Sequence, residues 1–208
     1  MSITYEKLID PILRNVRHYA PFFSAMKVGD KVLDVCCGTG AQVIEYGRNG
    51  IVATGIDNDQ NMVNSALRNK AKSAISNISF LLADAANLPF DDGSFDYASV
   101  SLGLHNKEEG VRNRIISEMK RVTSADGYLL FIDFNVPLPR NFWGILAQSI
   151  EFVAGGSHYK GFKDYIEKRG LVYILENHQL DSEKIDYLKS SLLTIVKARV
   201  HKTQKMAI

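Results

Sequence analysis

The sequence predicts a doubly wound α/β fold on a mostly parallel, seven-stranded sheet with an antiparallel final strand. Short apolar or β-branched runs alternate with helical stretches, as expected of repeated βαβ units. Two of these runs are apolar almost throughout, which is typical of strands with helices over both faces. Five parallel strands are expected at residues 31–35, 51–57, 78–84, 95–102 and 127–134.

Helical signals fill the gaps between these runs. Asp59 can accept hydrogen bonds from the first turn of a helix, so a helix is predicted from that residue. A second helix is predicted where apolar side chains recur at every third or fourth position, at Val111, Ile115, Met119 and Val122.

The two ends of the chain depart from the βαβ pattern. One or two helices are expected in residues 1–30, and an amphipathic helix follows the prolines after residue 135. A further helix over 162–171 should end at Gly170, and two closing strands are predicted at 171–177 and 192–200. We expect one domain over residues 1–208, with 1–30 and 135–165 as helical cap elements.

Composition excludes several classes of protein. The 208 residues are 46% hydrophobic with a net charge of +2, values typical of a globular domain and not of a general nucleic-acid binder. The two cysteines are adjacent, so they cannot staple distant segments, and no metal-ligand spacing occurs. A charged N-terminus and the lack of a long apolar run predict a cytoplasmic protein without a signal peptide or membrane span.

The stretch "KVLDVCCGTG" at 31–40 ends a predicted strand in small residues. Gly38 and Gly40 let the backbone turn sharply and approach a ligand. Asp57 ends the next strand, 57 − 38 = 19 residues later, where a carboxylate can bind ribose hydroxyls. Asp84 ends the third strand and could accept a bond from an adenine amino group. Because parallel strands end at one edge of a sheet, these residues predict a nucleoside site.

This stretch resembles the first motif, D-x-G-x-G-x-G, of the class I S-adenosylmethionine (SAM)-dependent methyltransferases. Asp34, Gly38 and Gly40 match the motif, while Cys36 stands where its first glycine usually lies. Residues 55–63, 81–106 and 118–134 are similar to the motifs that follow, so the resemblance covers roughly residues 30–135. It implies a Rossmann-like methyltransferase fold with SAM as cofactor and S-adenosylhomocysteine as product.

Within this class, "LGLHN" (102–106) and "SHYKGFKDYIEKRGL" (157–171) are most similar to the ubiquinone/menaquinone-biosynthesis C-methyltransferase group. That group typically has an arginine at the position of His105. The chain is also shorter than the group before the first strand and between residues 135 and 158, where substrate-recognition elements lie.

The resemblance implies a role for each matching position. Asp34 would contact the amino-acid end of the cofactor, and the methyl group should point toward the end of the fourth strand. Cys36 and Cys37 would be small residues beside the ligand or under the sheet, without a catalytic role. Cys36 can replace the glycine of the motif if its φ is negative. The implied cofactor site comprises Asp34, Cys36, Gly38, Gly40, Asp57, Asn58, Met62, Asp84, Ala85, Leu102 and Gly103.

The function predicted in this way is methyl transfer to a small, apolar or aromatic acceptor. A non-catalytic SAM-binding module is a second hypothesis, motivated by the short cap and the missing arginine. An NAD-linked oxidoreductase is a third, disfavoured because Val43 occupies the place of the third glycine that seats a pyrophosphate. A small-molecule acceptor is the expected partner, with no nucleic acid, and the oligomeric state stays open.

Several residues are candidates for the acceptor side. His105 follows the fourth strand and could be a general base, although a helix-capping or surface role is favoured. Some aromatic and aliphatic residues could close over the cofactor or line the acceptor pocket, or could equally pack as ordinary core or surface residues. They are Tyr5, His18, Tyr19, Phe142, Trp143, Ile145, Leu146, His158 and Tyr159.

Overall fold

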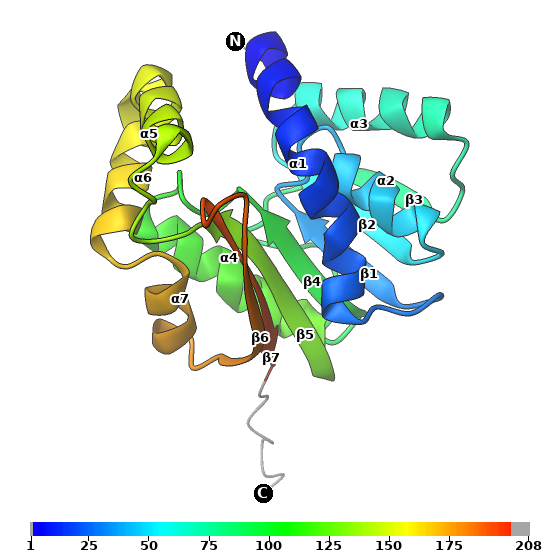
Figure 1. Cartoon of the computed structure of the whole chain (residues 1–208). Coiled ribbons are helices and arrows are strands. Elements are labelled where there is room, and N and C mark those ends of the chain that lie inside the picture. The colour runs from blue at the N-terminus through cyan, green and yellow to red at the C-terminus, as the bar shows by residue number, and fades with distance from the viewer. Residues whose placement is uncertain (1, 201–208) are drawn as a thin grey trace, which may run out of the picture.

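The structure, a computed structural model, describes the backbone of residues 2–200 and the side chains of residues 13–200. Its centre is a seven-stranded sheet in the order β3-β2-β1-β4-β5-β7-β6 (Figure 1). β7 pairs antiparallel with both β5 and β6, while the other pairings are parallel. The predicted fold class is confirmed. The strands are β1 Lys31–Val35, β2 Val52–Asp57, β3 Ile78–Leu82, β4 Phe95–Ser101, β5 Thr123–Phe134, β6 Asp181–Leu188 and β7 Leu193–Arg199.

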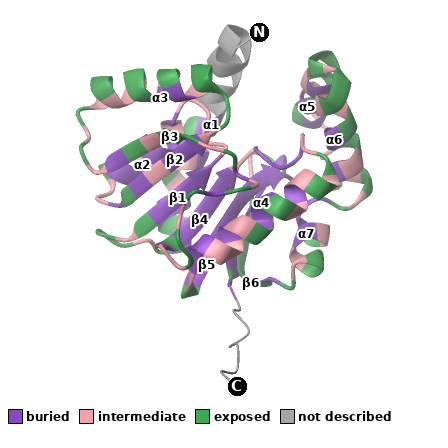
Figure 2. Ribbon diagram, turned by 180° about the vertical axis from the view of Figure 1, so that it is seen from behind, coloured by how far each residue is buried: buried purple, intermediate pink, exposed green. Residues whose placement is uncertain are grey.

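Helices cover both faces of this sheet. α1 lies in front of the strands in Figure 1, whereas α4 lies in front of them in the opposite view of Figure 2, so the two helices cover opposite faces. The central strands are buried almost throughout, which explains why they read as continuous apolar runs. The helices are α1 Ser2–Ser24, α2 Ala41–Arg48, α3 Gln60–Ser73, α4 Glu109–Val122, α5 Phe142–Ala154, α6 Gly156–Glu167 and α7 Leu171–Asn177.

Local signals mark the helices as expected. The Asp59 carboxylate caps α3 by accepting a 2.8 Å bond from the N–H of Asn61. Ile115, Met119 and Val122 of α4 are buried against the sheet. The helix predicted after the prolines is α5, and Figure 2 shows much of its outer surface exposed.

The closing region departs from the prediction at one element. Residues 171–177, expected as a strand, form α7, in which Leu171 and Ile174 are buried at helical spacing. Gly170 precedes this helix with a φ of 56°. The missing strand is β6, at the edge of the sheet, where its first five residues are all exposed. Its sequence is polar because an edge strand buries little, so the apolar pattern could not reveal it.

The strand order reverses between β1 and β4. β1 pairs with β2 on one side and with β4 on the other. In open α/β sheets, ligands bind beyond the carboxyl ends of the strands at such a switch point. The loops after β1 and β4 are therefore where the site is to be sought.

Candidate functional site

The glycine-containing loop after β1 is fixed by backbone contacts to β2. Cys37 N–H donates to the carbonyl of Ile56 at 2.9 Å, and Gly38 N–H donates to Asp57 Oδ2 at 2.9 Å. Gly40 precedes α2 with a φ of 76°, and a Cβ there would collide with the Phe80 ring. The loop thus requires glycine at position 40, and Asp57 holds it against β2.

The structure corrects one expectation about Cys36. A negative φ was the condition for Cys36 to replace glycine without strain, but its φ is 55°, in the left-handed region. Leu102, at the end of the adjacent β4, has a φ of 53°. A non-glycine residue in this region costs about 1–2 kcal/mol, and such strain concentrates at functional sites. Two neighbouring strands therefore both end in strained turns at the switch point.

A cavity of about 380 Å³, partly open to solvent, lies at the carboxyl ends of β1, β2 and β3. It brings together five of the predicted cofactor residues: Cys36, Asp57, Asn58, Asp84 and Ala85. The other lining residues are Ala83, Lys107, Val111 and Ile115.

The carboxylates of Asp57 and Asp84 order the turns around this cavity. Asp57 Oδ1 accepts a 3.0 Å bond from Asp59 N–H, and its other oxygen holds Gly38. Asp84 Oδ1 accepts a 2.9 Å bond from Ala86 N–H. Each oxygen keeps a second lone pair with which it could accept a ligand hydroxyl or amino group.

The Cys36 thiol lies close enough to all three predicted carboxylates to feel their charges. Burial raises its pKa to about 12, and the charges of Asp57, Asp34 and Asp84 contribute while Lys107 opposes them. All three carboxylates thus act on one side chain. A thiol with so high a pKa is inert as a nucleophile at neutral pH, as expected of a residue required for its size.

Asp34 lies deeper than the other two carboxylates. It is 1% exposed, and its Oδ1 accepts a 2.6 Å bond from the Ser99 hydroxyl of β4. Burial raises its pKa to about 7, although the Ser99 bond opposes the shift. It is absent from the lining of the cavity. To contact Asp34, the amino group of the cofactor would therefore have to extend beyond this cavity toward β1.

Met62, Leu102 and Gly103, which were also predicted to bind the cofactor, are not among the residues that line this cavity. Met62 is half-buried on α3. Gly103 is buried, and a Cβ there would lie 2.9 Å from Cys36 Cβ, so the two strand ends touch. Leu102 lines a second cavity on the other side of this contact.

The second cavity, of about 480 Å³ including open solvent, lies at the carboxyl ends of β4 and β5 and beneath α5. Among the described residues that line it, Glu151 alone carries a charge. The lining residues are Leu13, Leu102, Phe134, Trp143, Leu146, Ala147, Ile150, Glu151, Leu192 and Leu193.

Buried charges lie behind this apolar wall. His105 is fully buried, so the favoured view of it as a capping or surface histidine is wrong. Its Nδ1 lies 2.7 Å from Asp133 Oδ1, and its Nε2 lies 3.4 Å from Glu151 Oε1. Burial opposes protonation, but the two carboxylates outweigh it and raise the pKa of His105 to about 9. A base that is already protonated at neutral pH cannot accept the acceptor's proton.

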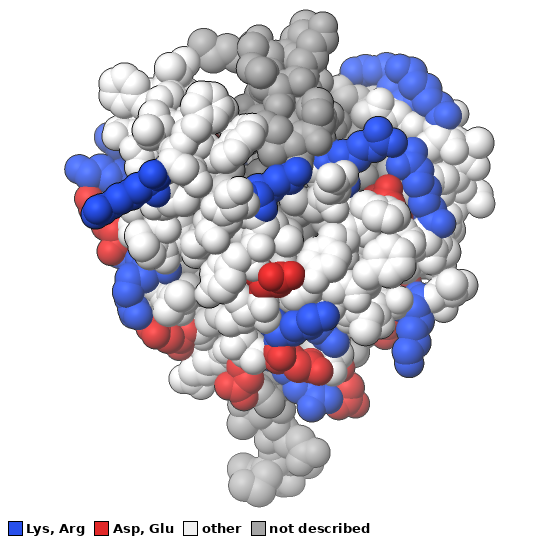
Figure 3. All heavy atoms as spheres, viewed as in Figure 1, with Lys and Arg blue, Asp and Glu red and all other residues white. Residues whose placement is uncertain are grey.

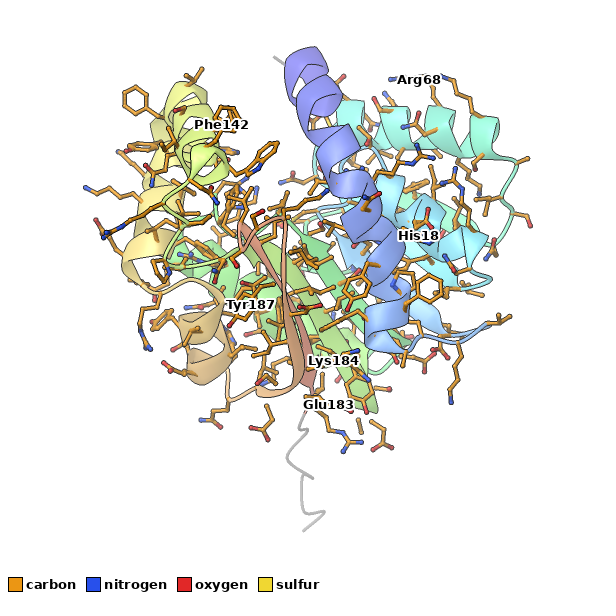
Figure 4. All side chains as sticks on the ribbon, viewed as in Figure 1. His18, Arg68, Phe142, Glu183, Lys184 and Tyr187 are labelled. Atoms are coloured by element: carbon orange, nitrogen blue, oxygen red, sulfur yellow. The ribbon has the colours of Figure 1, made fainter. Side chains whose placement is uncertain are left out.

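Some of the acceptor-side candidates on α5 line the second cavity, and others are exposed at the surface. Trp143 and Leu146 line the second cavity, whereas Phe142 and Ile145 are 68% and 66% exposed. Figure 4 shows Phe142 on α5, and Figure 3 shows that the tip of this helix carries neither acidic nor basic side chains. Tyr159 is half-buried beside Phe152, with ring centroids 5.4 Å apart.

The N-terminal candidates tie α1 to the body of the domain. His18, labelled in Figure 4, lies 2.8 Å from Glu45 of α2. The Tyr19 hydroxyl donates to Asp186 of β6 at 2.9 Å. The side chain of Tyr5 lies outside the described residues.

Sequence reasoning missed Lys107, Asp133 and Glu151. Asp133 interrupts the apolar run of β5, and Glu151 is the single charged residue of α5. A lone charge inside an apolar element is the signal that could have found both, because a buried charge must be paired. Within the described residues, no group of side chains could hold a metal ion, and no helix has the length and hydropathy to cross a membrane.

Comparisons with known proteins show which family the chain is similar to. Residues 32–127 match a family model described as "Methyltransferase domain". A demethylmenaquinone methyltransferase of Listeria monocytogenes is 33% identical over 144 residues, which cover 66% of this chain and 60% of that protein. One of Paenarthrobacter aurescens is 37% identical over 121 residues, or 57% and 45% of the two chains. The chain thus spans about half the length of these relatives.

The fold is also found among solved structures. A SAM-dependent methyltransferase from Aquifex aeolicus superimposes with a TM-score of 0.65 at 19% identity, covering 96% of this chain and 94% of the other. At this identity the likeness concerns the fold alone.

Proposed function

We propose, from the premise that this chain belongs to the class I SAM-dependent methyltransferases, that it transfers the methyl group of SAM to a small aromatic acceptor of the quinol type. The family model and the relatives confirm the predicted family and its cofactor. The acceptor class is supported by the relatives named as demethylmenaquinone methyltransferases and by the apolar second cavity.

The observation that best supports this proposal is the presence of two cavities along one edge of the sheet. The first cavity is lined by the ends of β1, β2 and β3 and by α4, and the second by the ends of β4, β5 and β7 and by α1 and α5. Cys36, which lines the first cavity, packs against Gly103, the neighbour in sequence of Leu102, which lines the second. A cofactor in the first cavity would present its methyl group at this contact to an acceptor in the second.

The proposed roles of the residues follow from this placement. Asp57 and Asn58 would bind the ribose, Asp84 and Ala85 the adenine, and Asp34 the amino group of the cofactor. Leu102 and Trp143 would hold the acceptor ring and exclude water from the reaction. In the transfer, an electron pair of the acceptor forms the bond to the methyl carbon, the methyl–sulfur pair stays on sulfur, and the acceptor releases a proton to water.

Incubation of the protein with methyl-labelled SAM and 1,4-dihydroxynaphthalene, the reduced form of 1,4-naphthoquinone, tests the proposal. Labelled methylnaphthalenediol should form. The Leu102→Arg variant should form much less of it, because the long charged side chain would occupy the acceptor cavity. Binding of S-adenosylhomocysteine with no label transferred to this acceptor or to a lipid extract would favour the non-catalytic binding module instead.

A further inference from the structure

Glu151 is an unusual residue to find at the acceptor cavity. The other lining residues are apolar or aromatic, while Glu151 is 1% exposed on the inner face of α5. Leaving an ionised carboxylate in such a place is costly unless it is paired and hydrogen-bonded. The residues around it supply that pairing.

Two histidines hold the Glu151 carboxylate from opposite sides. His105 Nε2 lies 3.4 Å from Oε1, close enough for an ion pair but too poorly aligned for a hydrogen bond. His158 Nδ1 lies 3.0 Å from Oε2. Burial alone would raise the pKa of Glu151, yet the two histidines outweigh it and lower this pKa to about 2. The carboxylate is therefore ionised at neutral pH.

Both histidines are themselves held in place. Asp133 accepts a bond at 2.7 Å from His105 Nδ1, and its other oxygen accepts bonds at 3.2 Å from the N–H groups of Leu104 and His105. On the other side, Asn106 Nδ2 lies 2.8 Å from His158 Nε2. If this amide donates to Nε2, the proton of His158 sits on Nδ1 and points at Glu151.

Such a fixed anion can recognise a hydrogen-bond donor but cannot readily remove its proton. Its low pKa makes Glu151 a weak base, and His105 is already protonated. His105 Nε2 makes no hydrogen bond to Oε1, and a carboxylate oxygen has more than one lone pair, so Oε1 can still accept a bond from a ligand. An acceptor with a hydroxyl group satisfies this oxygen, whereas one with a carboxylate or phosphate would be repelled.

We propose that Glu151 is the residue that selects the methyl acceptor, binding a ring hydroxyl at the wall of the apolar cavity while His105 and His158 position its carboxylate. This inference rests on the proposed function and adds to it the chemistry of the acceptor. The acceptor is then an apolar aromatic ring with at least one free hydroxyl, and ethers of the same size are poor acceptors.

Equilibrium dialysis of the full chain, saturated with S-adenosylhomocysteine, against 1-naphthol and 1-methoxynaphthalene tests this inference. The two probes share a ring, and only 1-naphthol can donate a hydrogen bond. The protein should bind 1-naphthol about tenfold more tightly, the effect typical of a hydrogen bond to a charged group. In Glu151→Gln this preference should fall to threefold or less, and in Gln148→Ala, on the exposed side of α5, it should persist.

Equal binding of the two probes by the unaltered protein, or no binding of either, overturns the inference without recourse to any variant. So does a tenfold preference that survives in a folded Glu151→Gln protein. Calorimetric titration of the same samples with S-adenosylhomocysteine separates these failures from failure of the proposed function, which loss of cofactor binding by the unaltered protein would indicate.

Discussion

The two halves of the sheet edge, named here for the cofactor and the methyl acceptor that we propose they bind, are built on different principles. The cofactor half, at β1 to β3, is made of local turns in which Asp57, Asp59 and Asp84 bind backbone N–H groups two residues away or across one strand. The acceptor half depends on side chains far apart in sequence, since His105 meets Asp133, Glu151 and His158. In the cofactor half, a substitution should therefore disturb one turn at a time. In the acceptor half, a substitution should disturb the whole network, because its side chains depend on one another.

The largest expected effect lies in the acceptor half. His105→Ala should lower the free energy of unfolding by about 3–5 kcal/mol, because it leaves the Asp133 and Glu151 carboxylates buried without their cation. Urea denaturation measures this change. His18→Ala, on the exposed side of α1, is the control and should change stability by less than about 0.5 kcal/mol. Similar small changes in both variants would contradict the network.

Stability should also depend on pH through His105. Its pKa is raised from 6.5 to about 9 in the folded protein, so its contribution is full below pH 6.5 and is lost as the pH rises through 9. Asp133, Glu151 and His158 face this ring, and the loss should be on the order of 3 kcal/mol. Denaturation at pH 6.5 and pH 10 measures it. A flat profile over this interval would show that His105 is neutral.

In the cofactor half, Asp34 should make cofactor binding pH-dependent. Its pKa is raised to about 7, so below this pH the carboxyl is neutral and must lose a proton to bind an ammonium group. Affinity for S-adenosylhomocysteine should therefore rise about 25-fold from pH 5.5 to 7.5, because the ionised fraction of the carboxyl rises by that factor. Calorimetry at the two values measures it, and Asp34→Asn should abolish the dependence. An equal rise in Asp34→Asn would assign it to another group.

The smallest expected effect concerns the strained turn at Cys36. Because its φ is 55°, Cys36→Gly should be more stable than Cys36→Ala by about 1 kcal/mol. Both variants remove the sulfur, so their comparison isolates the backbone. Thermal denaturation of the two proteins measures the difference. If Cys36→Ala were equally stable, the turn would not be left-handed in solution.

The success of sequence reasoning follows the same division. The five parallel strands and the positions of Asp57 and Asp84 could be predicted, because apolar runs and strand-end carboxylates are local signals. β6 and the burial of His105 could not, since one is a polar edge strand and the other depends on partners 28 and 46 residues away. The positive φ of Cys36 could not be predicted either, because the turn after β1 depends on the hydrogen bond between Cys37 and Ile56 of β2.

Titration of the protein with S-adenosylhomocysteine, in parallel with Asp57→Ala, tests the cofactor site most directly. The unaltered protein should bind one equivalent, and Asp57→Ala should bind at least tenfold more weakly, because it loses both a charged hydrogen-bond acceptor and the anchor of Gly38. Asp181→Ala, on the exposed β6, should bind like the unaltered protein. A folded protein that takes up no S-adenosylhomocysteine, or that binds it equally after the loss of Asp57, would contradict this assignment.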